Sequence, residues 1–219
     1  MITIDGPAGA GKSTVAREVA RRLRYRLLDT GAMYRALAWS VEQAGLPPAD
    51  TPALRRHLEG VTVDVREDGI SVDGRDVTAA IRSPAISTLT SQLTTLVPVR
   101  QKVTPIQRRL AGAGGAILEG RDTGTVVWPE AEVKFYLDAD LDVRARRRQA
   151  EFKAKGVEAD FEVVRAEIAA RDIQDMQRTL APLRAAADAI KLDTTHMSID
   201  EVVEAVLAAV GRQRCSTRS

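Results

Sequence analysis

The residues with the clearest chemical potential lie near the start of the chain. Residues 6–13 form a complete G-x-x-x-x-G-K-S/T motif, in which glycines let the backbone curl around an anion because no Cβ is in the way. Lys12 would reach the β- and γ-phosphates of a nucleotide, and the Ser13 hydroxyl would bind Mg²⁺. The motif predicts an ATP site made of Gly6, Pro7, Ala8, Gly9, Ala10, Gly11, Lys12, Ser13 and Thr14.

The sequence around this loop predicts the elements that must position it. Ile2-Thr3-Ile4 precedes the loop as a short apolar stretch, and Val15, Val19 and Leu23 recur at every fourth residue after it. A helix that begins at the loop places the partial positive charge of its N-terminus where phosphates would lie. This strand–loop–helix context favours a phosphate site over a plain glycine turn.

Further apolar stretches, separated by helical patterns, predict the fold. Each is followed directly by Asp or Glu, as expected where a buried strand gives way to a loop. Including the first, the five stretches are Ile2–Ile4, Arg26–Leu28, Ala116–Leu118, Val133–Leu137 and Ala189–Leu192. Strands that alternate with helices are typical of a parallel sheet. We therefore expect a P-loop NTPase-like α/β fold, with three α/β/α layers around a five-stranded parallel sheet.

One segment departs from this alternation. Val61–Val65 alternates strictly between apolar and polar residues, and Asp68-Gly69 predicts a hairpin turn into Ile70–Val72. We expect a small antiparallel β segment inserted at residues 60–83, and inserted segments of this kind usually lie over a ligand site. Capping residues predict helix starts at Thr30, which would cap a helix over Gly31–Ala44, and at Thr51-Pro52 and Ser83-Pro84.

Composition limits the class of protein. The 219 residues are 44% hydrophobic and 28% charged with a net charge of +2, which argues against a nucleic-acid binder driven by bulk charge. A single cysteine and the lack of a long apolar run lead us to expect a cytoplasmic protein without a membrane partner. We expect one domain over residues 1–219, a monomer that acts on small molecules, with a flexible tail at residues 212–219.

Arginines near the predicted strand ends distinguish among P-loop proteins. They occur at Arg35, Arg121, Arg144, Arg146–Arg148, Arg171 and Arg178. Convergent arginines suit a reaction between two phosphorylated molecules, because mutual repulsion and transition-state charge must both be neutralised. Solvated helix faces and intrahelical ion pairs are the alternative interpretation. The chain contains no asparagine, so it lacks the N-K-x-D stretch by which GTPases select guanine.

Four motifs, taken in order, resemble those of bacterial cytidylate kinases. They cover residues 4–14, residues 27–35, residues 119–127 and the pattern Arg171-Asp172-x-x-Asp175-x-x-Arg178. The resemblance runs nearly end to end and includes the inserted β segment and Ala181-Pro182-Leu183. Thr30 departs mildly, since relatives often have serine there, and Glu119 stands where some have aspartate. The resemblance implies transfer of the γ-phosphoryl group of ATP to CMP or dCMP.

The resemblance also implies a role for each matching residue. The CMP phosphate would be bound by Thr30, Tyr34, Arg35, Arg121 and Arg178. The cytosine edge would be read by Ser91, Arg100 and Asp122, and the sugar would contact Arg171 and Asp175. The catalytic residues would be Lys12, Arg121, Arg144 and Arg178, with Arg144 and its neighbours in an arginine-rich helical lid over ATP at residues 141–160. Mg²⁺ would be held by Ser13 and Glu119.

The sequence alone leaves two other functions open. The same scaffold could phosphorylate another acceptor, such as UMP, AMP or shikimate. The chain could also be a nucleotide-dependent switch or an RNA-binding ATPase, which would hydrolyse ATP slowly without an acceptor. The near-neutral charge and an aromatic content of 4% weigh against nucleic acid.

Overall fold

The computed structural model describes residues 1–66, 69–154 and 156–216. Contacts between residues divide the chain into two compact units. The first unit consists of Met1–Leu28 together with Ala111–Ser219, and the second is Asp29–Leu110. The phosphate loop belongs to the first unit and the inserted β segment to the second.

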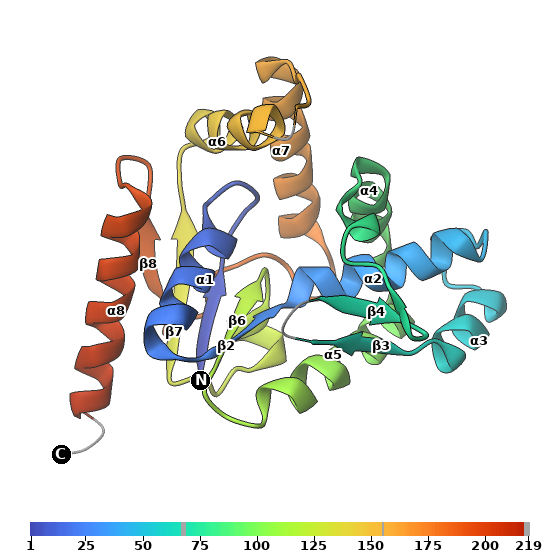
Figure 1. Cartoon of the computed structure of the whole chain (residues 1–219), viewed down its shortest axis with the longest axis horizontal. Helices are drawn as coiled ribbons and strands as arrows, with labels where there is room; N and C mark the ends of the chain where they lie inside the picture. Colours follow the sequence, from blue (N-terminus) through green and yellow to red (C-terminus); the bar gives the residue numbers. More distant parts are fainter. Residues whose placement is uncertain (67–68, 155, 217–219) are drawn as a thin grey trace. The chain divides into compact units, whose positions relative to one another are not determined.

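A five-stranded parallel sheet forms the centre of the first unit (Figure 1). Its strands lie in the order β2-β6-β1-β7-β8. They are β1 (Ile2–Asp5), β2 (Arg26–Asp29), β6 (Ala116–Gly120), β7 (Val133–Asp138) and β8 (Ile190–Asp193). The register places Asp5 beside Gly120 on one side and Tyr136 on the other, so the loops after all three strands begin at one edge. The predicted P-loop α/β fold is confirmed.

Helices α1 (Lys12–Leu23) and α8 (Ile199–Ser216) pack against one face of this sheet. Side chains alternate along a strand, so Ile2 and Ile4 point to this face together and are buried with Phe135 of β7. The apolar stripe of α1 predicted from its four-residue spacing is buried in the same cluster. The helix that follows the phosphate loop is thereby fixed to the strand that precedes it.

The other face of β1 carries a buried carboxylate that holds the turn after β6. The side chain of Asp5 accepts hydrogen bonds from the amide (2.9 Å) and hydroxyl (2.8 Å) of Thr123 and from the amide of Gly124 (2.8 Å). These donors belong to a single π-helical turn, η2 (Thr123–Val127). Burial raises the pKa of Asp5 to about 6, although the hydrogen bonds act in the opposite direction.

Two further helices, α6 (Leu141–Ala154) and α7 (Phe161–Gln177), pack against each other in the first unit. Their contact is centred on Ala145, Val164 and Ile168, which are all buried. Helix α6 carries the arginines predicted to form the lid, and α7 carries most of the last sequence motif.

The second unit combines helices with a separate antiparallel sheet of order β3-β4-β5. Its elements are α2 (Thr30–Gln43), α3 (Pro52–Gly60), β3 (Val63–Val65), β4 (Ile70–Val72), β5 (Arg75–Asp76), the 3₁₀ turn η1 (Ala80–Arg82), α4 (Pro84–Leu93) and α5 (Val97–Ala111). The predicted antiparallel segment is confirmed, and its third strand was not predicted. Asp68 of the predicted turn lies outside the described residues.

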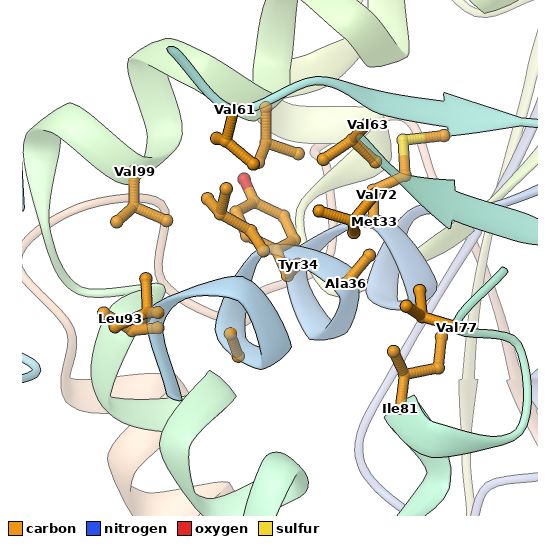
Figure 2. Close-up of a cluster of buried hydrophobic side chains, with 14 of the residues drawn as sticks. Met33, Tyr34, Ala36, Val61, Val63, Val72, Val77, Ile81, Leu93 and Val99 are labelled. Carbon is orange, nitrogen blue, oxygen red and sulfur yellow. The ribbon is translucent and has the colours of Figure 1, made fainter. Parts of the chain in front are cut away.

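The core of the second unit forms between α2 and the antiparallel sheet. Figure 2 shows Met33, Tyr34 and Ala36 of α2 beside Val63 and Val72, and all five side chains are buried. Burying a side chain such as that of Met33, Val63 or Val72 contributes roughly 1.5–3 kcal/mol. The helix that carries three of the predicted acceptor-binding residues is thus fixed to the inserted β segment.

Capping residues set the starts of the helices, with one correction. Thr51 and Ser83 cap their helices as predicted, each accepting a hydrogen bond from the backbone amide three residues on. Thr30 does not cap α2, which begins at Thr30 itself. The carboxylate of Asp29 accepts instead from the amide of Ala32 (2.8 Å) and is the cap. An aspartate in the extended conformation fulfils this role as well as a threonine does.

Helix ends follow the expected chemistry in the described residues. Gly156, just beyond α6, has a φ of +73° and donates its amide to the carbonyl of Lys153 (3.0 Å), as is typical of a glycine after a helix. Lys155 lies outside the described residues. Helix α8 continues through Ser216, so the described part of the predicted C-terminal tail is helical. Among the described helices, none has the length and apolar character needed to cross a bilayer.

The raised pKa of Asp5 predicts a pH dependence of stability. Between pH 4 and pH 6 the folded chain holds a proton at Asp5 that the unfolded chain releases, so unfolding becomes easier as the pH rises. The free energy of unfolding of the wild type minus that of Asp5→Asn should fall by about 3 kcal/mol over this range and level off above it. Denaturant titration at several pH values measures the difference.

Asp188→Asn is the matched control for this prediction. Its carboxylate is exposed and paired with Lys134, which holds the pKa of Asp188 below its usual value. The stability that Asp188 contributes is therefore lost only below about pH 4. For Asp188→Asn, the difference in free energy of unfolding from the wild type should stay constant across pH 4–6. The same constant difference for Asp5→Asn would contradict the raised pKa of Asp5.

Candidate active site

The phosphate loop connects β1 to α1, as the sequence predicts. Gly6, Gly9 and Gly11 all have positive φ angles, of +149°, +76° and +83°. A Cβ at Gly6 would collide with the carbonyl oxygen of Leu137, and one at Gly9 would lie 2.9 Å from the carbonyl oxygen of Arg144. Glycine is therefore required at both positions by conformation and by space, and the curled backbone leaves amides that can surround an anion.

Lys12 is a buried cation at the start of α1. Its Nζ donates a hydrogen bond to the carbonyl of Pro7 (2.7 Å), inside the loop itself. Burial and the charge of Arg121, with a smaller effect of Arg171, lower the pKa of Lys12 to about 7, and the carboxylate of Glu119 opposes this shift. A polyphosphate in the loop would supply negative charge that favours the protonated amine.

One buried carboxylate orients two of the predicted arginines. Asp175, near the end of α7, accepts a hydrogen bond from Arg121 Nε at 3.1 Å, and its other oxygen lies 3.6 Å from Arg178 Nη1. The amide of Leu183 donates to the carbonyl of Asp175 (2.8 Å) and folds the chain back over the end of the helix. Guanidinium groups held in this way are suited to bind the oxygens of a phosphate.

Other predicted residues of the first unit lie near these arginines in the sequence, in the motif at residues 171–178 and beside Arg121. Arg171 and Asp175 share a face of α7, one turn apart, but the helix ends at Gln177 and Arg178 is the first residue beyond it. Of the three spaced residues of this motif, only Arg171 and Asp175 therefore lie on the helix. Asp122 is buried directly after Arg121, at the start of the turn that Asp5 holds.

The residues predicted to hold Mg²⁺ offer the oxygen ligands that this ion prefers. Ser13 has an exposed side chain in the first turn of α1, and Glu119 is buried on β6 within electrostatic range of Lys12. Within the described part of the chain, no group of three or more His, Cys, Asp or Glu could bind a metal. A hydroxyl and a carboxylate still fit Mg²⁺, because it is usually held by one or two side chains together with phosphates and waters.

Arg144 contacts the phosphate loop from helix α6. The sequence placed it in a lid over ATP, but its side chain is buried and donates to the carbonyls of Ala139 (Nε, 2.9 Å) and Ala8 (Nη1, 3.0 Å). It also forms a buried ion pair with Asp172 of α7. Its neighbour Arg146 is exposed, with its guanidinium carbon 5.9 Å from the centre of the Phe161 ring.

The remaining predicted residues belong to the second unit, where α2 carries three of them. Asp29 caps this helix and also accepts a hydrogen bond from Arg35 Nη2 at 2.9 Å. Thr30 is buried in the first turn. The space around Gly31 is tight, since a Cβ there would be 3.1 Å from Arg35 Nη1 and 3.2 Å from Asp29 Oδ1.

Tyr34 and Arg100 come together within the second unit. The guanidinium carbon of Arg100, on α5, lies 5.7 Å from the centre of the Tyr34 ring, within the range of a cation–π contact. Both side chains are buried, and Arg100 also donates to the carbonyl of Thr94 (3.4 Å). Ser91 is half-buried on α4, a helix that packs against α2. A buried arginine stacked on a ring is well placed to recognise a planar polar ligand.

Three acidic residues of this site were not predicted from the sequence. Asp5 precedes the loop and anchors the turn after β6, Asp29 caps α2 and positions Arg35, and Asp172 pairs with Arg144. Each has a weak signal in the sequence, because Asp5 and Asp29 directly follow predicted strands and Asp172 lies inside the motif at residues 171–178. All three are buried or half-buried and act on other protein groups, which residue spacing alone does not reveal.

Comparison with known proteins identifies the family. The sequence model of the cytidylate kinase family matches residues 2–212. A cytidylate kinase of Symbiobacterium thermophilum is 49% identical over 94% of each chain, and one of Syntrophotalea carbinolica is 46% identical over 98% of this chain and 93% of its own. A crystal structure of an uncharacterized protein from Eubacterium ventriosum shares the fold, with a TM-score of 0.52 at 10% identity over 96% of this chain and 97% of its own. With its phosphate loop, its arginines and this match over nearly its full length, the chain belongs to the cytidylate kinase family.

Proposed function

We propose that the protein transfers the γ-phosphoryl group of ATP to CMP or dCMP, giving ADP and CDP or dCDP. The observation that carries the proposal is the buried cation Lys12 in the phosphate loop, near Arg121, in a chain of the cytidylate kinase family. The like charges around Lys12 match a reaction in which two phosphate groups must be brought together. We further propose that the protein acts as a monomer on small molecules in the cytoplasm.

On the donor side, the loop amides would surround the β-phosphate of ATP and Lys12 would contact the β- and γ-phosphates. Ser13 and Glu119 would hold Mg²⁺, which when bound neutralises charge on the phosphate oxygens. The ammonium group of Lys12 uses one of its three N–H donors for the hydrogen bond to Pro7, so two donors are left for the phosphates. The exposed Arg146 on α6 is available to contact ATP from the lid.

On the acceptor side, the CMP phosphate would be bound by Thr30, Tyr34, Arg35, Arg121 and Arg178. Arg171 and Asp175 would contact the sugar. The pairing of Asp175 with two arginines supports these roles, because it holds both guanidinium groups in fixed orientations. No general base is required, since the attacking oxygen of CMP is already anionic at neutral pH. Catalysis would depend on positioning and on charge neutralisation by Lys12, Arg121 and Arg178.

Base recognition is proposed for Ser91, Arg100 and Asp122. Cytosine presents an amino donor at N4 and an acceptor at N3, whereas uracil presents an acceptor at O4 and a donor at N3. A carboxylate at Asp122 can accept from the amino group, and Arg100 can donate to the ring acceptors. Both side chains are buried, so uracil would leave charged groups unpaired away from water.

An acceptor panel tests the proposed function directly. Release of ADP should be measured with a coupled assay in the presence of CMP, dCMP, UMP, AMP or shikimate. CMP and dCMP should support turnover far better than the other three acceptors. Turnover dominated by UMP, AMP or shikimate would replace the acceptor in the proposal. ATP hydrolysis that no acceptor accelerates would favour a switch ATPase.

Replacing Lys12 tests the charge at the phosphate loop. Lys12→Ala should lower kcat by roughly 10³-fold or more, because the ammonium group stabilises charge that develops in the transition state. Circular dichroism should show that the fold is retained. Lys191→Ala removes an exposed lysine from strand β8 and should leave turnover unchanged. A Lys12→Ala enzyme with near-normal kcat would remove Lys12 from the mechanism.

Replacing Asp122 tests the choice of base. The wild type should prefer CMP to UMP by roughly 10⁴-fold in kcat/KM. Asp122→Ala should lose about 2–4 kcal/mol of transition-state stabilisation with CMP, as expected for a lost contact to a charged group, and change far less with UMP. Steady-state kinetics with both acceptors measure the ratio. If the variant keeps the wild-type CMP-to-UMP ratio, Asp122 does not read the base.

A further inference from the structure

A buried ion pair lies against the phosphate loop on the side of helices α6 and α7. Arg144 of α6 and Asp172 of α7 form this pair, and their residues are only 7% and 6% exposed. Arg144 is further fixed by its hydrogen bond from Nε to the carbonyl of Ala139. The pair thus joins two helices at the point where they meet the loop.

Both members of the pair hold the same residue of the loop. The amide of Ala8 donates to Asp172 Oδ1 (3.3 Å), and the carbonyl of Ala8 accepts from Arg144 Nη1 (3.0 Å). The methyl group of Ala8 packs against the apolar cluster between the two helices, which consists of Ala145, Val164 and Ile168. The amide, the carbonyl and the side chain of Ala8 are therefore all used to fix its position.

The next residue of the loop is constrained by the same helix. Gly9 approaches Arg144 so closely that a Cβ would lie 2.9 Å from both the Cβ and the carbonyl oxygen of Arg144. Burying two charges is expensive, and apolar residues of similar volume often stabilise a protein as well or better. The polar pair does what an apolar pair cannot, because only polar groups can bond to both the amide and the carbonyl of Ala8.

We propose that Arg144 and Asp172 are positioning residues that hold the phosphate loop in the shape that binds the triphosphate of ATP. They act through the backbone of Ala8 and Gly9 and do not themselves contact the nucleotide. This role takes the place of the direct contact between Arg144 and ATP expected from the sequence. It rests on the proposed function only in taking the loop as the ATP site.

An apolar replacement of the whole pair separates positioning from stability. Asp172→Leu alone should lower Tm strongly, because it leaves the Arg144 guanidinium buried and unpaired. The double variant Arg144→Met/Asp172→Leu should recover most of this loss. Its KM for ATP, and its Kd for ATP measured without CMP, should nevertheless rise at least about tenfold, the effect expected from losing two hydrogen bonds. Its KM for CMP should change less than threefold.

Arg165→Met is the matched control. It breaks the exposed ion pair between Arg165 and Asp142, which joins the same two helices away from the loop, and should leave the KM for ATP at the wild-type value. If the double variant recovers its Tm and binds ATP as the wild type does, the pair is only structural and the proposal is wrong. An equal rise in KM for ATP and for CMP would overturn it as well.

Hydrogen exchange provides a second test if the double variant does not fold. In the ligand-free wild type the amide of Ala8 should exchange slowly, because it is bonded to Asp172. The variant Asp172→Ala removes the acceptor and should speed exchange at Ala8, whereas Asp142→Ala should not. Unchanged protection of Ala8 in Asp172→Ala would contradict the proposal. Because this measurement uses neither CMP nor turnover, it remains valid even if the acceptor is another molecule.

Discussion

The ammonium group of Lys12, buried beside other positive charges, is the constraint on which the rest of the first unit depends. Burial and Arg121 lower the pKa of Lys12 to about 7, and the carboxylates of Glu119 and Asp5 only partly compensate. A group in such surroundings is incompletely neutralised by the protein itself. An anion with several charges, such as the triphosphate of ATP, would neutralise the remaining positive charge. The charges of the site are thus preorganised for this ligand.

The neighbouring elements hold the phosphate loop and the arginines around Lys12 in place. The loop backbone passes too close to Leu137 and Arg144 for any side chain at Gly6 or Gly9. Asp5 fixes the turn that follows Arg121, while buried carboxylates on α7 hold the arginines of the site and the loop itself. Such buried charges lower stability and are retained where function requires them.

Much of this fold follows from the sequence, because buried parallel strands are short apolar runs and the phosphate loop has a nearly fixed spacing. Other features could not be predicted, for physical reasons. Asp29 and Thr30 are adjacent and both can cap a helix, so spacing does not decide between them. Strand β5, Arg75–Asp76, is exposed and has no apolar alternation. A run of arginines on a helix does not reveal that Arg144 is buried, because its partner Asp172 is distant in sequence.

The central claim is that the buried charge of Lys12 lowers the stability of the ligand-free protein and serves to bind a polyphosphate. Comparing the thermal unfolding of the wild type and Lys12→Met, with and without saturating ATP and Mg²⁺, tests it most directly. Without nucleotide at pH 6, Lys12→Met should be at least as stable as the wild type, because it removes a buried charge. With nucleotide the order should reverse, since only the wild type gains the full binding energy. A ligand-free Lys12→Met protein that is clearly less stable than the wild type, or equal stabilisation of both by ATP, would contradict the account.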